Sequence, residues 1–272
     1  MKLAGAPISW GVCEVPGWGH QLDPERVLSE MRELGLTATE LGPDGYLTPG
    51  LIGRHGLRLV GAFVPVVLHD PRHDPLAGLL DDLPGEGTLV LAAATGSDGY
   101  DARPELDDAG WATLLSNLDR IAAALGPRAC LHPHVGTMVE RRDEVERVLR
   151  GSSVPLCLDT GHLLIGGTDP ADLVRSDPSR VAHVHLKDVD AALAARVSSG
   201  ELTYTEAVRA GVYRPLGQGD VDIAGIVTGL AGSGYDGWFV MEQDVILSGP
   251  DERPVENVRQ SIAYLDEVLA AR

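Results

Sequence analysis

The sequence predicts an α/β fold, a single closed (β/α)8 barrel of eight parallel strands. The first observation is a recurring unit, in which a short apolar run is followed by a polar loop and a helical pattern. The second is length, because 272 residues suit a barrel that takes roughly 250. The third is that no GxGxxG motif of a doubly wound sheet follows the first apolar run. We therefore expect one domain over residues 1–272.

The predicted strands are eight short apolar runs bounded by polar loops. Runs of this kind are typical of strands that are buried on both faces of a parallel sheet. In chain order they are Ile8–Trp10, Thr39–Leu41, Leu57–Phe63, Thr88–Leu91, Ala129–His132, Pro155–Asp159, Val181–Leu186 and Trp238–Glu242.

Helical patterns lie between these runs. Asp23–Leu34 opens with Asp-Pro, which is a helix start signal, and Asp108–Leu125 carries apolar residues at helical spacing. The C-terminal segment has the single apolar stripe of an amphipathic helix. That stripe consists of Val255, Val258, Ile262, Leu265 and Leu269.

One unit is longer than the others. About 189–219, after the seventh predicted strand, the chain holds an insertion that includes the helix-like stretch Tyr204–Gly211. Segments that follow the carboxyl end of a barrel strand lie on the catalytic face. We expect this insertion to lie over the active site.

Composition and charge exclude several kinds of partner. There are 40 acidic and 22 basic residues, and the net charge of -18 disfavours nucleic acid, which needs a basic surface. No apolar run is long enough for a signal peptide or a membrane span. The three cysteines, Cys13, Cys130 and Cys157, are scattered and odd in number, which indicates reduced thiols and a cytoplasmic protein.

Three polar residues stand at the carboxyl ends of otherwise apolar runs. Asp159 ends VPLCLD, His185 lies near the end of VAHVHLKD, and Glu242 ends GWFVME. Strand ends converge on one rim of a barrel, and unpaired charges beside a core are costly. These three residues, called the ligand group below, therefore predict a metal site.

Other polar residues near the predicted rim are candidates for either a structural or a functional role. His183 lies two residues before His185 and is most simply a core histidine, and His132 and His134 repeat that spacing around Pro133. Glu140 precedes a predicted helix, so it is either a site residue or an acidic residue favoured near a helix N-terminus. Gly161 lets the backbone turn, which would direct His162 toward a substrate.

Two further side chains are candidates for contact with the substrate. Trp10 ends the first predicted strand, where it is either a packing residue or an apolar wall for a sugar face. Arg214 lies where the insertion returns to the rim, and we expect it to contact substrate oxygens.

The ligand chemistry favours one exchangeable divalent cation. Two carboxylates and one imidazole, with a further carboxylate available, form a set rich in oxygen, and no cysteine lies at these strand ends. Such a set suits Mn²⁺, which we expect here, with Co²⁺, Mg²⁺, Fe²⁺ or Zn²⁺ as alternatives.

Several segments resemble one known superfamily over nearly the whole chain. LCLDTGHLLIGG, VAHVHLKD, PLGQGDVD and WFVMEQD resemble the xylose-isomerase-like TIM-barrel superfamily of sugar phosphate isomerases and epimerases. HPHVGTMVE and ELGPDGYL look like inosose (2-keto-myo-inositol) dehydratase-like proteins within it. The segment SWGVCEVPGWG departs from the Trp-Thr-Asn-Asp opening of dehydratases that act on inosose.

The resemblance implies four metal ligands, which are Glu140, Asp159, His185 and Glu242. His134 is the alternative for the first position, because many relatives carry that ligand at the strand end, where this chain has HPH. The resemblance also implies that His162, Lys187 and Glu40 contact substrate.

The chemistry that fits is proton transfer next to a carbonyl, through an enolate. Loss of a hydroxyl from the next carbon gives a dehydratase, which is a lyase, whereas return of the proton gives an epimerase or isomerase. Glu140, Glu242 or His162 would exchange protons with help from Lys187. The expected substrate is a small molecule, a keto-inositol or ketose, in carbohydrate metabolism such as inositol catabolism.

Two other functions compete with this prediction. A lyase that cleaves a 3-keto C- or O-glycoside by β-elimination would use the same enolate chemistry and a large pocket. A non-catalytic sugar-binding barrel would not need Asp, His and Glu at one rim. The sequence leaves open whether the chain forms a homo-oligomer.

Overall fold

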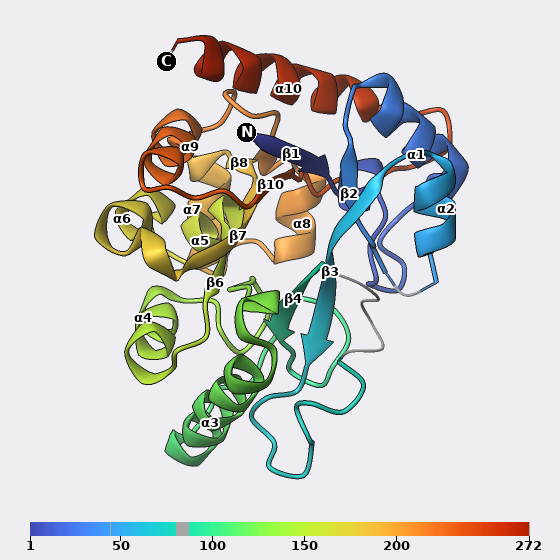
Figure 1. The fold of residues 1–272 in the computed structure, drawn as a ribbon. Coiled ribbons are helices and arrows are strands. Elements are labelled where there is room, and N and C mark those ends of the chain that lie inside the picture. The colour runs from blue at the N-terminus through green and yellow to red at the C-terminus, as the bar shows by residue number, and fades with distance from the viewer. Residues whose placement is uncertain (44, 80–86, 272) are drawn as a thin grey trace.

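The computed structural model describes residues 1–43, 45–79 and 87–271, and its centre is a closed parallel barrel (Figure 1). Neighbouring strands follow the order β1-β10-β7-β6-β5-β4-β3-β2. This architecture confirms the predicted (β/α)8 barrel. The strands are β1 (Lys2–Gly5), β2 (Ala38–Glu40), β3 (Arg58–Val66), β4 (Thr88–Ala93), β5 (Ala129–Leu131), β6 (Leu156–Asp159), β7 (Val181–Leu186) and β10 (Trp238–Met241).

The prediction for the first strand is wrong. Ile8–Trp10 lies in the 3-10 helix η1 (Pro7–Trp10), and β1 precedes it, paired in register with β10 from Lys2 opposite Trp238. Pro7 fixes its own φ and lacks an N–H, so it suits the first turn of a helix and not the middle of a sheet. The apolar run resembles a strand more than β1 does, because β1 is short and begins with a lysine.

The outer layer of the barrel is helical, and α10 (Val255–Ala270) runs across one end of it (Figure 1). Asp23 caps α1 (Pro24–Glu33) by accepting hydrogen bonds from the N–H groups of Glu25 and Arg26, as the start signal predicts. The helical patterns at 108–125 and in the C-terminal segment are confirmed. The remaining outer elements are α2 (Pro49–Arg54), α3 (Asp108–Leu125), η2 (Gly126–Arg128), α4 (Arg142–Gly151), α5 (Thr160–Ile165), α6 (Pro170–Ser176), η3 (Pro178–Arg180) and α9 (Ile223–Gly232).

Residues 189–219 leave the barrel after β7 and return before α9. They form α7 (Ala191–Ser198) and α8 (Tyr204–Arg209), and a short antiparallel pair joins β8 (Asp188–Val189) to β9 (Tyr213–Arg214). The base of the insertion is therefore tied by backbone hydrogen bonds, and α8 carries Tyr204 into the pocket described below.

Strand alternation directs neighbouring residues of β7 to opposite sides of the barrel wall. On β7, Val184 and Leu186 belong to the core between strands and helices, whereas His183 and His185 contact Glu40 across the barrel. Polar side chains of neighbouring strands therefore meet inside the barrel. None of the described helices has the length and hydropathy of a membrane-spanning segment.

Asp188 fixes the path by which the insertion returns to the barrel. Its fully buried carboxylate accepts hydrogen bonds from the backbone N–H groups of Val189, Gly217, Gly219 and Val221 at 2.8 to 3.1 Å. A Cβ at Gly219 would lie 2.3 Å from the Asp188 Oδ1 atom, so this turn needs glycine.

We predict that Asp188→Ala lowers the free energy of unfolding by about 3 kcal/mol, because it leaves several buried N–H donors without an acceptor. Asp188→Asn keeps one acceptor oxygen, so its free energy of unfolding should fall between those of the wild-type protein and Asp188→Ala. Urea unfolding followed by circular dichroism measures both changes.

Asp220→Ala is the matched control in the same turn, because that exposed aspartate accepts a single N–H bond, from Ala191. An equal loss of stability in the Asp188 and Asp220 variants would contradict the proposed role of Asp188.

Candidate active site

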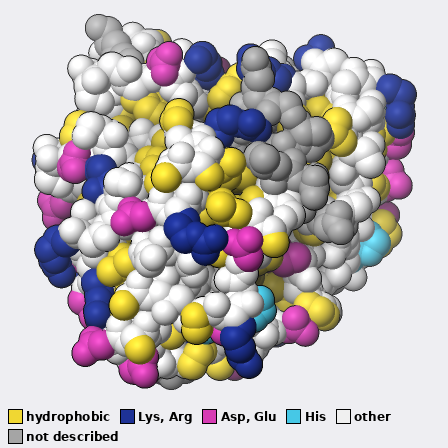
Figure 2. Space-filling view, turned by 60° about the horizontal axis from the view of Figure 1, so that its bottom comes forward, with side chains coloured by type: hydrophobic (Ala, Val, Ile, Leu, Met, Phe, Trp, Pro, Cys, Tyr) yellow, Lys and Arg dark blue, Asp and Glu magenta, His cyan; other side chains and the backbone are white. Residues whose placement is uncertain are grey.

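The carboxyl ends of the strands open into a pocket of about 640 Å³. Figure 2 shows the molecule from the side toward which β3 and β4 point in Figure 1, with apolar side chains gathered near the middle. The charged and imidazole side chains that line the pocket are Glu14, Glu40, His132, His134, His185, Lys187, Glu242 and Asp244. The pocket therefore joins the barrel interior to the rim.

Asp159 has a separate role for each carboxylate oxygen. It ends β6 and caps α5, because its Oδ1 atom accepts hydrogen bonds from the N–H groups of Gly161 and His162 at 2.9 and 2.8 Å. The Oδ2 atom points into the barrel, 3.0 Å from His132 Nε2 and 3.6 Å from His185 Nδ1. The backbone thus orients one oxygen and leaves the other for the site.

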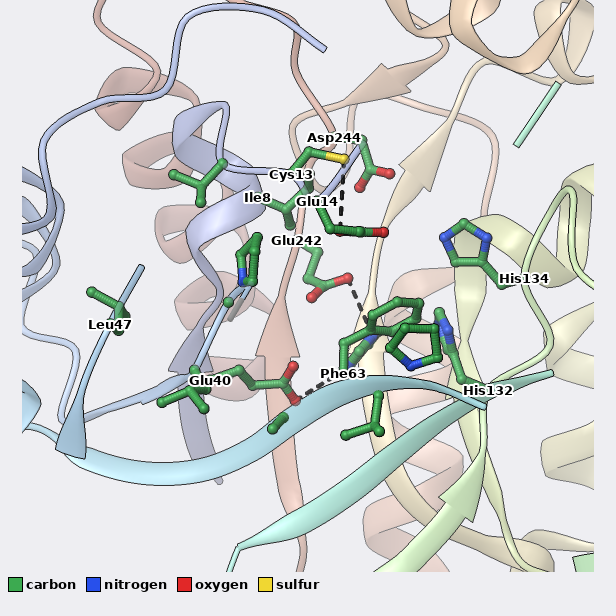
Figure 3. A pocket seen from close by; sticks show the side chains of 18 of the residues that line it. Ile8, Cys13, Glu14, Glu40, Leu47, Phe63, His132, His134, Glu242 and Asp244 are labelled. Carbon is green, nitrogen blue, oxygen red and sulfur yellow. Dashed lines mark hydrogen bonds and ion pairs between the residues drawn. The ribbon is translucent and has the colours of Figure 1, made fainter. Parts of the chain in front are cut away.

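Glu40 orients His185 from the opposite side of the barrel. Glu40 points into the pocket (Figure 3). Its Oε1 atom lies 3.1 Å from His185 Nε2 and 2.7 Å from His183 Nε2. An ionised carboxylate only accepts hydrogen bonds, so Nε2 of His185 donates to Glu40 and Nδ1 is the ring nitrogen that faces the other site residues. Glu40 has room because its neighbour is Gly61, where a Cβ would lie 2.8 Å from Oε1.

The ligand group converges on one point. His185 Nδ1 lies 3.1 Å from Glu242 Oε2. Asp159, His185 and Glu242 each contribute an atom to a set in which all atoms lie within 4.8 Å of one another. Register explains part of this, because Asp159 and His185 are direct partners on β6 and β7. The structure thus brings together the three residues that the strand-end pattern singled out.

The electrostatics of this point favour positive charge. Burial alone would raise the pKa of Asp159, but Lys187 holds it well below its usual range, so the carboxylate is ionised. Burial alone would lower the pKa of His185, but the neighbouring thiol and carboxylates, Glu242 and Glu40 among them, raise it well above its ordinary value. A site that draws a proton onto a buried imidazole is also suited to a cation.

The donor set fits a divalent metal. Nδ1 of His185 is buried and has no hydrogen-bond partner among the described residues, although two carboxylate oxygens lie near it. His132 adds a second imidazole, and it groups with Asp159 and His162 within the same distance limit. Two carboxylates with imidazole nitrogens suit Mn²⁺, Fe²⁺, Co²⁺ or Zn²⁺.

Glu140 lies outside this group, contrary to the role that the resemblance implied. Its carboxylate forms an ion pair with Arg103 at 3.2 Å and accepts a hydrogen bond from the Gly136 N–H at 2.9 Å. It therefore stabilises the loop after β5. The position beside Asp159 belongs to His132, the first residue after β5, and His134 lies further along the pocket wall.

Lys187 is the cation of the pocket floor. Its Nζ atom lies 2.7 Å from Asp244 Oδ1, 3.2 Å from Glu242 Oε2 and 3.5 Å from Asp159 Oδ2. Burial alone would lower the pKa of Lys187, but these carboxylates raise it well above its ordinary value, so the ammonium form persists. Asp244 is held in turn by the hydroxyl of Tyr204, which donates to Oδ2 at 2.6 Å.

His162 lies behind Lys187 and not among the described residues that line the pocket. The ammonium donates to His162 Nε2 at 3.0 Å, and burial lowers the pKa of His162 well below its usual value, so the imidazole is neutral. Its ring packs on His134 with 3.7 Å between centroids. His162 therefore positions Lys187, whereas His134 and Glu40 do line the pocket.

Trp10 and Arg214 do not reach the pocket, contrary to expectation. Trp10 is fully buried, and its Nε1–H donates to Glu30 Oε2 at 2.7 Å, which anchors α1. Arg214 lies at the surface, where it pairs with Asp190 at 3.0 Å. Trp18 supplies the indole of the pocket wall.

Asp244 was not among the site residues predicted from the sequence, although its spacing from Glu242 could have indicated it. It follows Glu242 by two residues, so in extended chain both side chains point to the same side. Tyr204 carries no comparable signal, since its contact with Asp244 joins residues from distant parts of the chain.

Known proteins match this chain over most of its length. A family model described as xylose isomerase-like TIM barrel matches residues 84–268. An inosose dehydratase of Geobacillus kaustophilus (strain HTA426) is 33% identical over 296 aligned residues, which cover 98% of this chain and 94% of that protein.

Two solved structures have the same fold. An L-ribulose 3-epimerase matches with a TM-score of 0.67 at 15% identity, over 99% of this chain and 94% of its own. The IOLI protein, in a crystal structure with a bound zinc atom, matches with a TM-score of 0.67 at 13% identity, over 100% of this chain and 99% of its own.

We predict that His132→Ala weakens Mn²⁺ binding by roughly tenfold or more, because it removes a donor beside Asp159, whereas Glu140→Gln leaves the metal in place. Asp159→Ala and His185→Ala should abolish stoichiometric binding. Elemental analysis of purified protein and calorimetric titration with Mn²⁺ give the two readouts.

Loss of metal in the Glu140 variant and its retention in the His132 variant would assign the fourth ligand position to Glu140.

Proposed function

This chain belongs to the xylose isomerase-like TIM-barrel family, and we propose that it is a divalent-metal-dependent enzyme that moves a proton next to the carbonyl of a keto-inositol or ketose. The observation that carries the proposal is the convergence of Asp159, His185, Glu242 and His132 on one point of a pocket, beside the Lys187 ammonium. A binding protein has no need of such a group at the floor of its pocket.

Asp159, His185, Glu242 and His132 would hold the metal. When bound, a divalent metal supplies Lewis-acid stabilisation of the negative charge that develops on oxygen next to the reacting carbon. Glu40 keeps the Nδ1 atom of His185 directed to the site, through its 3.1 Å contact with Nε2.

Two pocket groups suit the proton transfers. Burial alone would raise the pKa of Glu242, but His185 and Lys187 lower it, so Glu242 is ionised and can accept a proton from carbon. Lys187 keeps its proton and can donate it to the departing hydroxyl, which leaves as water. Positioned acids and bases of this kind contribute roughly 10²- to 10⁴-fold to rate.

The products follow from the fate of the carbanion. Loss of a hydroxyl from the next carbon gives dehydration, and return of the proton to the other face gives epimerisation. The relative named inosose dehydratase supports the first outcome, in inositol catabolism, and the fold of an L-ribulose 3-epimerase is compatible with the second. We favour dehydration because Lys187 offers a proton to a leaving group.

We also propose that the insertion at 189–219 covers the active site as part of the single domain. Tyr204 lines the pocket and holds Asp244, and the Tyr204 and Tyr213 hydroxyls lie 3.0 Å apart. The preferred metal is Mn²⁺ on ligand type, with Zn²⁺ as the alternative supported by the zinc atom in the IOLI structure.

A second candidate is β-elimination from a 3-keto glycoside, which uses the same proton abstraction and expels a sugar-linked group instead of water. The observation in its favour is the pocket volume of about 640 Å³, which is large for a single ring.

We predict that the Mn²⁺-loaded protein catalyses exchange of the α-proton with solvent deuterium for at least one member of a panel of keto-inositols, ketoses and 3-keto glycosides. Lys187→Met should lower turnover by roughly 10²- to 10⁴-fold while bound metal is retained, because it removes the proton donor and no ligand. Proton NMR in D₂O follows exchange and product together.

Glu140→Gln serves as the active control, because Glu140 lies outside the ligand group. Binding of a ketose without exchange, for every member of the panel, would favour a sugar-binding barrel and defeat the proposal.

A further inference from the structure

The pocket has two chemically different parts. The charged and imidazole groups gather at the barrel interior, whereas one wall, called the apolar wall below, is built from side chains without charge. The apolar wall consists of Ile8, Val12, Trp18, Leu47 and Phe63. Its members come from the segments after β1 and β2 and from β3.

We propose that the apolar wall is a subsite for an uncharged aromatic substituent that the substrate carries on its ketosugar ring. This inference rests on the proposed function, because it assumes a ketosugar ring at the metal centre. It names the class of group that occupies the rest of the pocket.

Volume is the first argument. A ketocyclitol has about twelve non-hydrogen atoms, and each bonded atom occupies less than the roughly 30 Å³ of a liquid water molecule, so the ring fills less than about 360 Å³. The pocket measures about 640 Å³. The difference has room for a second ring.

The position of the apolar wall is the second argument. In Figure 3, Ile8 and Leu47 lie on the side of the pocket away from His132 and His134, with Glu40 and Glu242 between them. A ring at the ligand group therefore leaves a substituent facing the apolar wall. The wall is continuous with the metal centre, since Phe63 packs edge-on against His132 at 5.9 Å between centroids.

The wall is also preorganised for a flat, apolar group. Val12, Trp18 and Leu47 are buried by the protein itself. The Trp18 Nε1–H already donates to the Val245 carbonyl at 3.0 Å, so the indole offers its ring and no free donor. Unpaired hydroxyls are costly to bury against such a surface, which favours an aromatic ring over a second sugar.

Charge is the fourth argument, and it excludes acidic substituents. Glu14, Glu40, Glu242 and Asp244 line the pocket, and Lys187 is the one Lys or Arg among the described residues that do so. Its ammonium is already shared between Asp244 and Glu242. A phosphate or carboxylate would meet four acidic side chains in the lining and find no Lys or Arg among the described lining residues that is free to pair with it, so the substituent is uncharged.

The test compares four probes on the Mn²⁺-loaded protein, which are 3-ketoglucose, its phenyl β-glycoside, 3-ketocellobiose and 3-ketoglucose 6-phosphate. We expect the phenyl glycoside to show a kcat/KM for α-proton exchange about 10- to 100-fold above that of 3-ketoglucose, because an apolar ring is removed from water. The phosphate should be the poorest substrate.

Variants of the wall locate the effect. Leu47→Ala should lower the ratio of the kcat/KM for the phenyl glycoside to that for 3-ketoglucose by about tenfold, and Ile8→Ala, at a partly buried position, should lower it in the same direction. Leu51→Ala is the matched control, because Leu51 packs on the core and lies outside the pocket lining.

The outcomes separate the two proposals. Exchange on no probe and on no member of the earlier panel would overturn the proposed function. Exchange on 3-ketoglucose with an equal or lower kcat/KM for the phenyl glycoside would overturn the subsite alone. Preference for 3-ketocellobiose or for the phosphate, or an unchanged ratio in both wall variants, would do so as well.

Discussion

Burial of like charges at one end of the barrel is the constraint on which the site depends. Asp159 is fully buried, and Glu40, Glu242 and Asp244 are nearly so. Buried carboxylates are stable only when they are paired and hydrogen-bonded. Lys187 forms ion pairs with three of them, and the two histidines of β7 pair with Glu40. The N–H groups at the start of α5 donate hydrogen bonds to one oxygen of Asp159. The charge that remains lies at the ligand group, where a divalent cation would offset it.

The barrel makes room for these charged side chains by placing glycines next to them. Glu40 occupies the space that a side chain at Gly61 would fill. A Cβ at Gly161 would lie 2.7 Å from the Lys187 Cβ atom and 2.8 Å from the Tyr213 ring. The packing that admits the charged network is therefore built from the same backbone that forms the strands and caps α5.

Alternation along strands made part of this site predictable. Asp159, His185 and Glu242 could be located from the sequence because a strand places its last residues at the rim. The position of His132 beside Asp159 could not, because β5 is short and the resemblance pointed to Glu140, with His134 as the alternative, whereas the fold pairs Glu140 with Arg103. The expectation that Trp10 reaches the pocket is wrong for a related reason, since the first strand lies before the apolar run that contains Trp10. Periodicity reports which face a residue takes within an element, but not how a loop returns to the barrel.

This division between strands and loops also organises the pocket. The residues proposed for chemistry stand on or next to β2, β5, β6, β7 and β10, where pairing registers hold them, whereas much of the apolar wall comes from the segments after β1 and β2. Loops change without disturbing a barrel, so the two parts can change independently. A shared set of strand-end ligands therefore specifies proton chemistry next to a carbonyl, and the loops above it specify which ketosugar is admitted. In this chain, the residues that resemble the family therefore lie at the floor of the pocket, and the residues proposed to select the substrate lie in its apolar wall.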